Sequence, residues 1–256
     1  MAATLPDRPS PSEIHDLRVV VRRIQMMRKL VPRRLRDLED SRRFDTALRS
    51  VLKATSQLRD MDTLLETLES HTSGVTTELL VNLENQRSDV AARAKMATRV
   101  LKEVYAPELD ASELGGKRLS KRLRKRVGEH SGKALSLLTS VLNDESKAEE
   151  LHSLRKEIKK MRYLIELGDK ASTRLAALQK WQESLGAIRD LDVAIAYLAG
   201  GSGDSGRRAI LGLQRARHSN YLKFASDCRD DRTLNLGRRP PPERAPSMTG
   251  LRQTEE

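Results

Sequence analysis

The chain has 256 residues, of which 38% are hydrophobic, so it is long enough to bury one large core or two moderate ones. Its 48 Lys and Arg residues outnumber 36 Asp and Glu residues, and the formal net charge of +12 favours a phosphate-rich or other polyanionic partner. The single cysteine, Cys228, excludes a disulfide framework and a cysteine-based zinc site and fits a reducing compartment.

Residues 1–12 are rich in proline and contain no apolar stretch of the kind found in signal peptides. Nowhere does the chain contain about 18 uninterrupted apolar residues. We therefore expect a cytoplasmic protein with no membrane association. We expect residues 1–11 to be a flexible N-terminus, followed by a helical domain over residues 12–228.

The first predicted helix begins near Ser12 and ends around Leu30, because Pro32 disfavours its continuation. One side of this helix is polar within a sector of about 80° and carries His15, Arg18, Arg22, Gln25 and Lys29. The opposite side is apolar and carries Leu17, Val20, Val21, Ile24, Met27 and Val31. Such a helix packs on a core along one face and leaves the other face free.

Helical periodicity continues along almost the whole chain, and alternating β-branched and aromatic runs are missing, so we predict an all-α fold. Helices are expected over residues 41–69, with a break or bend near Arg59, and over residues 75–105. The Gly115-Gly116 pair marks the expected boundary between two halves, 12–114 and 115–228. The second half is predicted to contain helices over 117–142, 148–168, 172–198 and 206–228.

Residues 229–256 combine a proline run with scattered Arg, Ser, Thr and Glu, and they contain too few apolar residues to offset the entropy of ordering. We expect this segment to be a disordered tail. Because its charges nearly cancel, the basic excess of the chain lies in the helical domain.

Two motifs each occur twice, in the same order. His15-x-x-Arg18 with Arg22-Arg23 has a counterpart in His152-x-x-Arg155 with Lys159-Lys160. Arg59-Asp60-x-Asp62 and Arg189-Asp190-x-Asp192 follow at similar separations. Duplication at this long period predicts two related halves rather than a solenoid of many short units. Two copies of one basic helix also predict one ligand held from two sides.

The second copy of the basic helix has the same two-sided pattern. Its polar side carries His152, Arg155, Lys159 and Arg162, and its apolar side carries Leu154, Ile158, Met161 and Ile165. A row of guanidinium and ammonium groups on each helix matches the repeated charge of a linear phosphate polymer, which it meets through charge-assisted and often bidentate hydrogen bonds. Both histidines are expected to strengthen binding as the pH falls, because a neighbouring phosphate favours their charged form.

The densest basic segment is residues 117–126, which has seven cations and no acid. Leu119, Leu123 and Val127 fall on one face of this predicted helix, so the other face is heavily basic. Three interpretations of that face stay open: an ordinary solvated surface, part of the lining of the ligand site, or a nucleic-acid patch.

The aspartates of the repeated Arg-Asp-x-Asp elements have a structural and a functional reading. In the structural reading they are expected to cap a following helix or to orient Arg59 and Arg189 by ion pairing. The two arginines themselves are expected to point toward the ligand. Carboxylates at positions i and i+2 do not point the same way on a helix, so we expect no metal site.

With these motifs in view, the sequence resembles the CHAD family of conserved-histidine α-helical domains over roughly residues 12 to 226. The resemblance implies two bundle-like helical halves facing each other across a basic channel, with inorganic polyphosphate as the ligand. Members of the family favour Arg at the position of Gln25, which implies one weaker contact in the first half.

Candidate polyphosphate-binding residues are the cations of the repeated motifs and of the basic segment. They are His15, Arg18, Arg22, Arg23, Arg28, Arg59, Arg118, Arg122, Lys125, His152, Arg155, Lys159, Lys160, Arg162 and Arg189. Secondary candidates are Gln25, Lys29, Arg87 and Arg215.

We expect a noncatalytic protein without cofactors, because the chain has no Walker-type loop, no Gly-x-Ser-x-Gly elbow and no His-Glu-x-x-His motif. A phosphohydrolase or phosphotransferase that uses the channel is one alternative. Nucleic-acid binding is the other, although one Trp, four Tyr and two Phe residues offer few platforms for stacking bases. The candidate roles are storage, granule scaffolding and regulation of the enzymes that make or degrade polyphosphate, which are further candidate partners.

Overall fold

The computed structural model describes residues 4–71, 77–108, 116–168, 172, 174–200 and 204–230. These residues form helices without a strand among them, which confirms the predicted all-α fold class. The helices are α1 (Pro11–Leu30), α2 (Arg33–Arg36), α3 (Glu39–His71), α4 (Thr77–Glu103), α6 (Gly116–Val141), α7 (Ala148–Gly168), α8 (Arg174–Ala199) and α9 (Asp204–Asp230). Gly115 and residues 231–256 of the expected tail lie outside the described residues, whereas residues 229 and 230, the first two of that tail, form the end of α9.

The start of α1 is fixed by a capping box two residues earlier than expected. The Ser10 hydroxyl accepts a hydrogen bond from the backbone N–H of Glu13, and the Glu13 carboxylate accepts one from the backbone N–H of Ser10 at 2.8 Å. Pro11 occupies the first helical position, where its missing N–H costs nothing. Ser12, the predicted start, is therefore already inside the helix. The predicted break in α3 near Arg59 is also absent, because this helix runs unbroken from Glu39 to His71.

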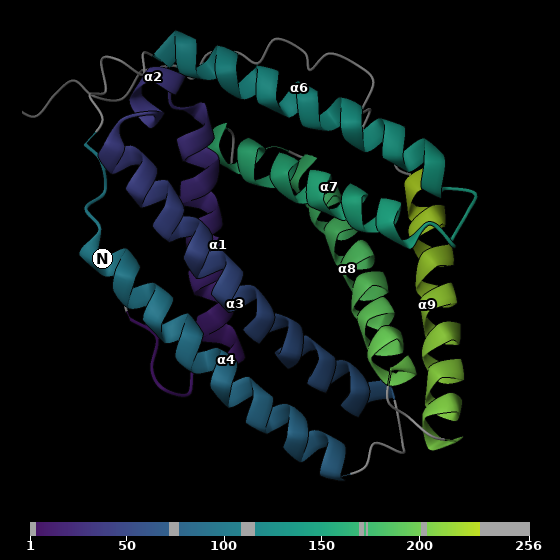
Figure 1. The fold of residues 1–256 in the computed structure, drawn as a ribbon. Helices are drawn as coiled ribbons and strands as arrows, with labels where there is room; N and C mark the ends of the chain where they lie inside the picture. The colour runs from purple at the N-terminus through teal and green to yellow at the C-terminus, as the bar shows by residue number, and fades with distance from the viewer. Residues whose placement is uncertain are drawn as a thin grey trace, which may run out of the picture.

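The helices form two sets that lie side by side (Figure 1). In the first set α3 packs against α1 and α4, and in the second α8 packs against α7 and α9. Helix α6 lies along α7 at the upper edge of the view in Figure 1. The two sets meet where α1 approaches α7 and where α3 approaches α8. Each basic helix of the repeated motif therefore has the other as a neighbour.

Residues 4–10 do not form the free arm that was expected of residues 1–11. Leu5 is buried against α4, and its backbone N–H donates to the Thr98 hydroxyl at 3.4 Å. Asp7 forms an ion pair with Lys95 of the same helix. This segment is therefore packed on the first helical set.

The apolar face of α1 is turned slightly from its predicted position. Val20 and Met27, which were expected on the packed side, are 48% and 45% exposed. Met26 and Leu30 are buried instead, because they pack against Tyr163 and Leu164 of α7. The contact between the two basic helices thus adds a second buried face to α1.

Two apolar clusters join the two helical sets. The first brings together the ends of α1, α7 and α6, through Met26, Leu30, Tyr163, Leu164 and the leucines of the basic segment. The second joins the later turns of α3 to α8, α4 and α9 and is made of Leu64, Leu68, Leu83, Leu191, Ala194, Leu198 and Leu213. Burial of this apolar surface holds the sets together at about 25 cal/mol for each Å² that is removed from water.

The same pair of hydrogen bonds occurs in both sets and is named here the arginine clasp. In the first set Arg87 donates to Asp62 at 2.6 Å and to the backbone carbonyl of Pro9 at 2.8 Å. In the second set Arg217 donates to Asp192 at 2.6 Å and to the backbone carbonyl of Glu145 at 2.8 Å. Each clasp ties the third helix of its set to the second and to the segment before the basic helix.

The clasps settle what Asp62 and Asp192 do. Both aspartates bind an arginine of the third helix, rather than capping a helix or pairing with Arg59 and Arg189. Arg87, a secondary candidate for ligand binding, is thereby engaged in a structural ion pair.

Removal of a clasp arginine is expected to destabilise the fold. Arg87→Ala leaves Asp62 as a buried charge without a partner, so we expect the free energy of unfolding to fall by about 3 kcal/mol. Chemical denaturation measures this loss. Arg93→Ala, an exposed position on the same helix, is the control and is expected to change stability by less than about 0.5 kcal/mol. Equal stability of the two variants would contradict the structural role of the clasp.

Candidate functional site

Basic side chains of four helices gather where the two helical sets meet. They are near enough to influence one another's protonation, and we call them the central cluster: Arg18, Arg22, Arg59, Arg155, Lys159 and Arg189. Helices α1 and α7 supply two each, and α3 and α8 supply one each. These residues all belong to the repeated motifs, and the two basic rows lie next to each other rather than on remote faces.

Arg18 is held in place by neutral groups of α3. Its guanidinium donates to the Leu52 carbonyl and to the Thr55 hydroxyl, both at 3.1 Å, and more weakly to the Ser56 hydroxyl at 3.4 Å. Burial, followed by repulsion from Arg22, lowers the pKa of Arg18 to about 10, so it remains charged at neutral pH. Arg18 is therefore fixed without being neutralised. Nothing in the repeated motifs indicated Thr55 or Ser56.

Arg22 and Arg155 each have a buried Nε–H without a hydrogen-bond acceptor among the described residues. The Arg155 guanidinium lies against α8 at Gly186. A side chain at position 186 would place its Cβ atom 3.6 Å from the Nε of Arg155. Burial lowers the pKa of Arg155, and the nearby Asp190 only partly offsets this effect. A buried donor without an acceptor costs about 1–3 kcal/mol, so an anion that reaches these groups recovers that energy.

Lys159 is the most strongly perturbed residue of the cluster. Burial lowers the pKa of its amine to about 7, and Arg22, Arg155, Arg18 and Arg162 act in the same direction. The amine is thus about half neutral at pH 7 in the unliganded protein. An anion placed among these groups would restore its positive charge.

Asp60 and Asp190 are carboxylates that interact electrostatically with the arginines of the cluster. Burial raises the pKa of both, and the neighbouring arginines, including Arg18 for Asp60 and Arg155 for Asp190, act against this. Within the described part of the chain, no cation of the central cluster has a carboxylate within the 4.0 Å of an ion pair. Six cations therefore face two carboxylates, and the cluster keeps a strong positive field.

The two histidines of the repeated motif differ in their surroundings. His15 is exposed, whereas His152 is half-buried and its Nδ1 has no partner among the described residues. Burial, followed by repulsion from Arg189, Lys156 and Arg155, lowers the pKa of His152. His152 is therefore neutral at pH 7 without a ligand, and its protonation requires a more acidic solution than an ordinary histidine does.

Several predicted binding residues have partners outside the central cluster. Arg162 lies at its edge and binds Glu166 and Gln182, and the exposed Arg23 approaches the same Glu166 at 3.5 Å. Arg28 is buried and binds Asp45 at 2.9 Å, so it ties α1 to α3 instead of facing a ligand. Lys160 binds Glu157 on the other side of α7.

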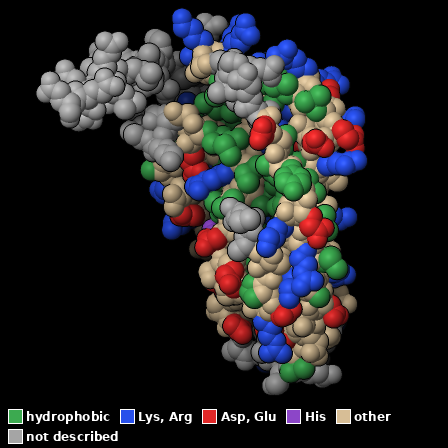
Figure 2. Space-filling model, turned by 90° about the vertical axis from the view of Figure 1, so that its left-hand side faces the viewer, with side chains coloured by type: hydrophobic (Ala, Val, Ile, Leu, Met, Phe, Trp, Pro, Cys, Tyr) green, Lys and Arg blue, Asp and Glu red, His purple; other side chains and the backbone are tan. Residues whose placement is uncertain are grey.

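The remaining candidates are spread over the surface. Arg122 donates to the backbone carbonyl of Leu30 at 3.3 Å and so caps the end of α1, whereas Arg118 and Lys125 are exposed on α6. Lys29 is exposed, Gln25 is half-buried on α1, and Arg215 is exposed on α9. On the face drawn in Figure 2, Lys and Arg side chains gather at the upper end, where Figure 1 places α2 and α6.

The described residues include no group of three or more His, Cys, Asp or Glu side chains placed to hold a metal ion. No helix in the described ranges is both long enough and apolar enough to cross a membrane.

The model of the CHAD domain matches residues 2–199 of this sequence. The chain belongs to the CHAD family. The match includes both copies of both motifs, in agreement with the resemblance seen in the sequence.

A solved structure, the crystal structure of the CHAD domain from the plant Ricinus communis, has a similar fold. The two chains are 22% identical, the TM-score is 0.51, and the alignment covers 89% of this chain and 79% of the plant chain. At this identity the similarity shows that the fold is shared. None of the curated proteins matches the chain.

Proposed function

We propose that this CHAD domain binds inorganic polyphosphate at the central cluster and does not cleave it. One observation carries the proposal: six cations from four helices lie together, partly buried, without an ion-pair partner among the described residues. Such an arrangement destabilises the unliganded protein and is relieved by a ligand of high negative charge.

The arrangement of the cations favours a flexible linear anion. Arg18 and Arg22 follow one side of α1, and Arg155 and Lys159 follow one side of the neighbouring α7. Each pair is separated by one helical turn, or about 6 Å, so successive phosphates of one chain meet cations from both helices. Each contact is a charge-assisted hydrogen bond, and several together bind tightly even after the cost of desolvation.

The positions of the aromatic residues favour polyphosphate over nucleic acid. Phe44, Tyr163, Trp181, Tyr221 and Phe224 are buried, and Tyr197 is half-buried. Tyr105 is the exposed aromatic residue, and it follows the end of α4 rather than lying in the central cluster. Single-stranded nucleic acids are bound largely by stacking on exposed aromatic rings, which the cluster does not provide.

A competition experiment separates these two ligands. We expect saturable binding of long-chain polyphosphate at physiological salt, with an affinity that falls steeply as salt is added. Single-stranded DNA or RNA at the same phosphate concentration is expected to displace less than half of it. Equal or better displacement by nucleic acid would favour the alternative function.

The absence of catalysis and the location in the cell are separate parts of the proposal. Incubation with polyphosphate is expected to release no phosphate; release that is lost in His15→Ala or His152→Ala would instead indicate a hydrolase.

A fluorescent fusion is expected to concentrate on polyphosphate granules and to become diffuse in cells that cannot make the polymer. At the granule the protein would act in storage, as a scaffold, or as a regulator of polyphosphate-metabolising enzymes. A diffuse signal in both kinds of cell would contradict granule association.

A further inference from the structure

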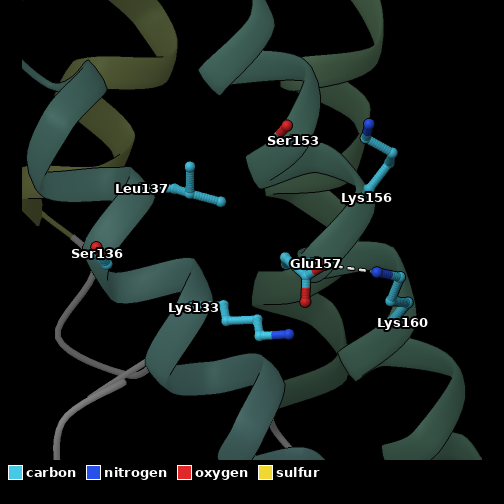
Figure 3. A pocket seen from close by; sticks show the side chains of 7 residues that line it. All are labelled: Lys133, Ser136, Leu137, Ser153, Lys156, Glu157 and Lys160. Carbon is cyan, nitrogen blue, oxygen red and sulfur yellow. Dashed lines mark hydrogen bonds and ion pairs between the residues drawn. The ribbon is translucent and has the colours of Figure 1, made fainter.

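A second basic site lies on α7 next to the central cluster, about 100° around the helix from the row of Arg155 and Lys159. It is a hollow of about 410 Å³ between α6 and α7 (Figure 3). It is lined by three lysines, two serines, one glutamate and one leucine: Lys133, Lys156, Lys160, Ser136, Ser153, Glu157 and Leu137. We call it the α6–α7 hollow.

The charges of the hollow are arranged around one fixed carboxylate. Glu157 is buried and binds Lys160 and His130, each at 2.5 Å. These two hydrogen bonds lower the pKa of Glu157, although burial, the largest single effect, acts to raise it. Glu157 therefore stays ionised, orients the Lys160 amine and links α7 to α6.

Two lysines of the hollow remain without a partner. Lys133 and Lys156 are exposed, and neither has a carboxylate within ion-pair distance in the described ranges. Figure 3 shows Lys133 reaching from α6 toward Glu157 on α7, with the hydroxyl of Ser153 farther along α7. Ammonium groups and hydroxyls that approach from two helices suit an oxyanion that accepts hydrogen bonds in several directions.

The hollow is connected to the central cluster by further cations. Along α7, Lys156 and Lys160 each follow a central-cluster residue by one position, so two basic rows run along the same helix about 100° apart. Lys29 of α1 is exposed but lies near Lys160 of α7 and Arg126 of α6, and desolvation of its amine by the surrounding helices, followed by repulsion from these two cations, lowers its pKa. A basic path thus runs from α1 past Lys29 to the hollow.

We infer that the α6–α7 hollow is a second binding site for phosphoryl groups. Its occupant is either the continuation of a polyphosphate chain that fills the central cluster, which rests on the proposed function, or a separate small phosphate compound. Lys133 and Lys156 bind the oxyanion directly, and Glu157 positions Lys160 for the same purpose.

The test uses the full chain with Lys133→Ala and Lys156→Ala combined. The matched control combines Lys102→Ala and Lys223→Ala, which remove the same charge from exposed positions on α4 and α9. Affinity for long-chain polyphosphate, tripolyphosphate and pyrophosphate is measured for both variants, and circular dichroism verifies folding.

If a polyphosphate chain continues from the central cluster into the hollow, we expect the hollow variant to bind the long polymer about 10-fold more weakly than the control does. Both variants should bind tripolyphosphate equally well. The slope of log Kd plotted against the logarithm of the salt concentration should also decrease by about 1 to 2, because two phosphate contacts are lost.

The other outcomes either assign the hollow to a small phosphate compound or contradict the inference. Loss of one pyrophosphate site in the hollow variant, with long-chain binding unchanged, would assign the hollow to a small phosphate compound. If the wild-type chain binds no polyphosphate at all, the proposed function fails, and pyrophosphate binding alone decides the role of the hollow. Identical behaviour of the hollow variant and the control toward all three ligands would overturn the inference.

Discussion

The variant that combines Arg22→Ala, Arg155→Ala and Lys159→Ala is expected to bind long-chain polyphosphate at least about 100-fold more weakly than the wild-type protein. A loss of only about 2.7 kcal/mol produces this factor, and three charge-assisted contacts to phosphate exceed that amount. The three residues are chosen because their cationic groups have no carboxylate partner. Arg18 is left unchanged, since it also bonds to α3.

Although this variant is expected to bind polyphosphate more weakly, its free energy of unfolding without ligand is expected to stay the same or to rise. The three side chains repel one another, and Arg22 and Arg155 each bury an Nε–H without an acceptor, so their removal should leave the unliganded protein at least as stable as the wild type. Thermal denaturation without ligand checks this expectation. Polyphosphate should then raise the Tm of the wild-type protein and have little effect on the variant.

The control for this experiment removes three exposed cations elsewhere, by Arg93→Ala, Lys102→Ala and Lys223→Ala. Its net charge equals that of the central-cluster variant, so a difference between the two reports position rather than total charge. We expect the control to bind polyphosphate within about 3-fold of the wild type at physiological salt, where distant charges are screened. A folded central-cluster variant with the affinity of the control would falsify the proposed site.

The affinity for polyphosphate is expected to fall about 10-fold between about pH 7 and pH 8.5, because binding requires Lys159 to take up a proton. The pKa of this amine is about 7 in the unliganded protein, well below its ordinary value, owing to burial and then to Arg22 and Arg155. Phosphate favours the charged amine and raises its pKa in the complex. Above pH 7 a proton therefore binds together with the ligand, whereas below pH 7 the amine is already charged.

Lys159 also predicts how the stability of the free protein varies with pH. In the unfolded chain the amine holds its proton up to about pH 10.5, whereas in the folded chain it loses the proton above about pH 7. The folded protein therefore gains stability as the pH rises from 7 toward 10.5, by at most about 4 to 5 kcal/mol, and partial exposure of the site reduces this figure. Over this range, folding becomes more favourable while binding becomes weaker.

Two substitutions at position 159 test the pH dependence. Lys159→Arg keeps a charge that does not titrate in this range, and Lys159→Met removes the charge. Both should bind long-chain polyphosphate with little dependence on pH between about 7 and 8.5, and only the arginine variant should approach the wild-type affinity at pH 7. A full pH dependence retained in both variants would show that another group takes up the proton.

Much of the fold was predictable because helix patterns depend on neighbouring residues. Amphipathic periodicity and the positions of proline and glycine placed the long helices to within a few residues, from α1 to the end of α9. The start of α1 was placed two residues late, although Ser10 and Glu13 have the spacing of a capping box and could have revealed it. The short helix α2 was not predicted, because its four residues have no periodic pattern of their own.

The central cluster was predictable in part, because its residues belong to motifs that occur twice. Charge alone did not distinguish Arg28 from Arg22, since the partner of Arg28 is Asp45 on another helix. The clasp arginine of the second set, Arg217, was also missed, although it follows Asp192 by the same 25 residues that separate Arg87 from Asp62. That equal spacing is the signal that could have identified it.

The arginine clasps have a consequence for inherited or engineered changes in this domain. Each clasp fixes the starting point of one basic helix, and each helical set has its own. Damage to one clasp therefore disturbs one row of cations and leaves the other row supported, so intermediate phenotypes should arise more readily than complete loss. Affinity itself is adjustable at Arg22, Arg155 and Lys159 without touching the clasps, which makes the domain a suitable starting point for sensors with graded responses.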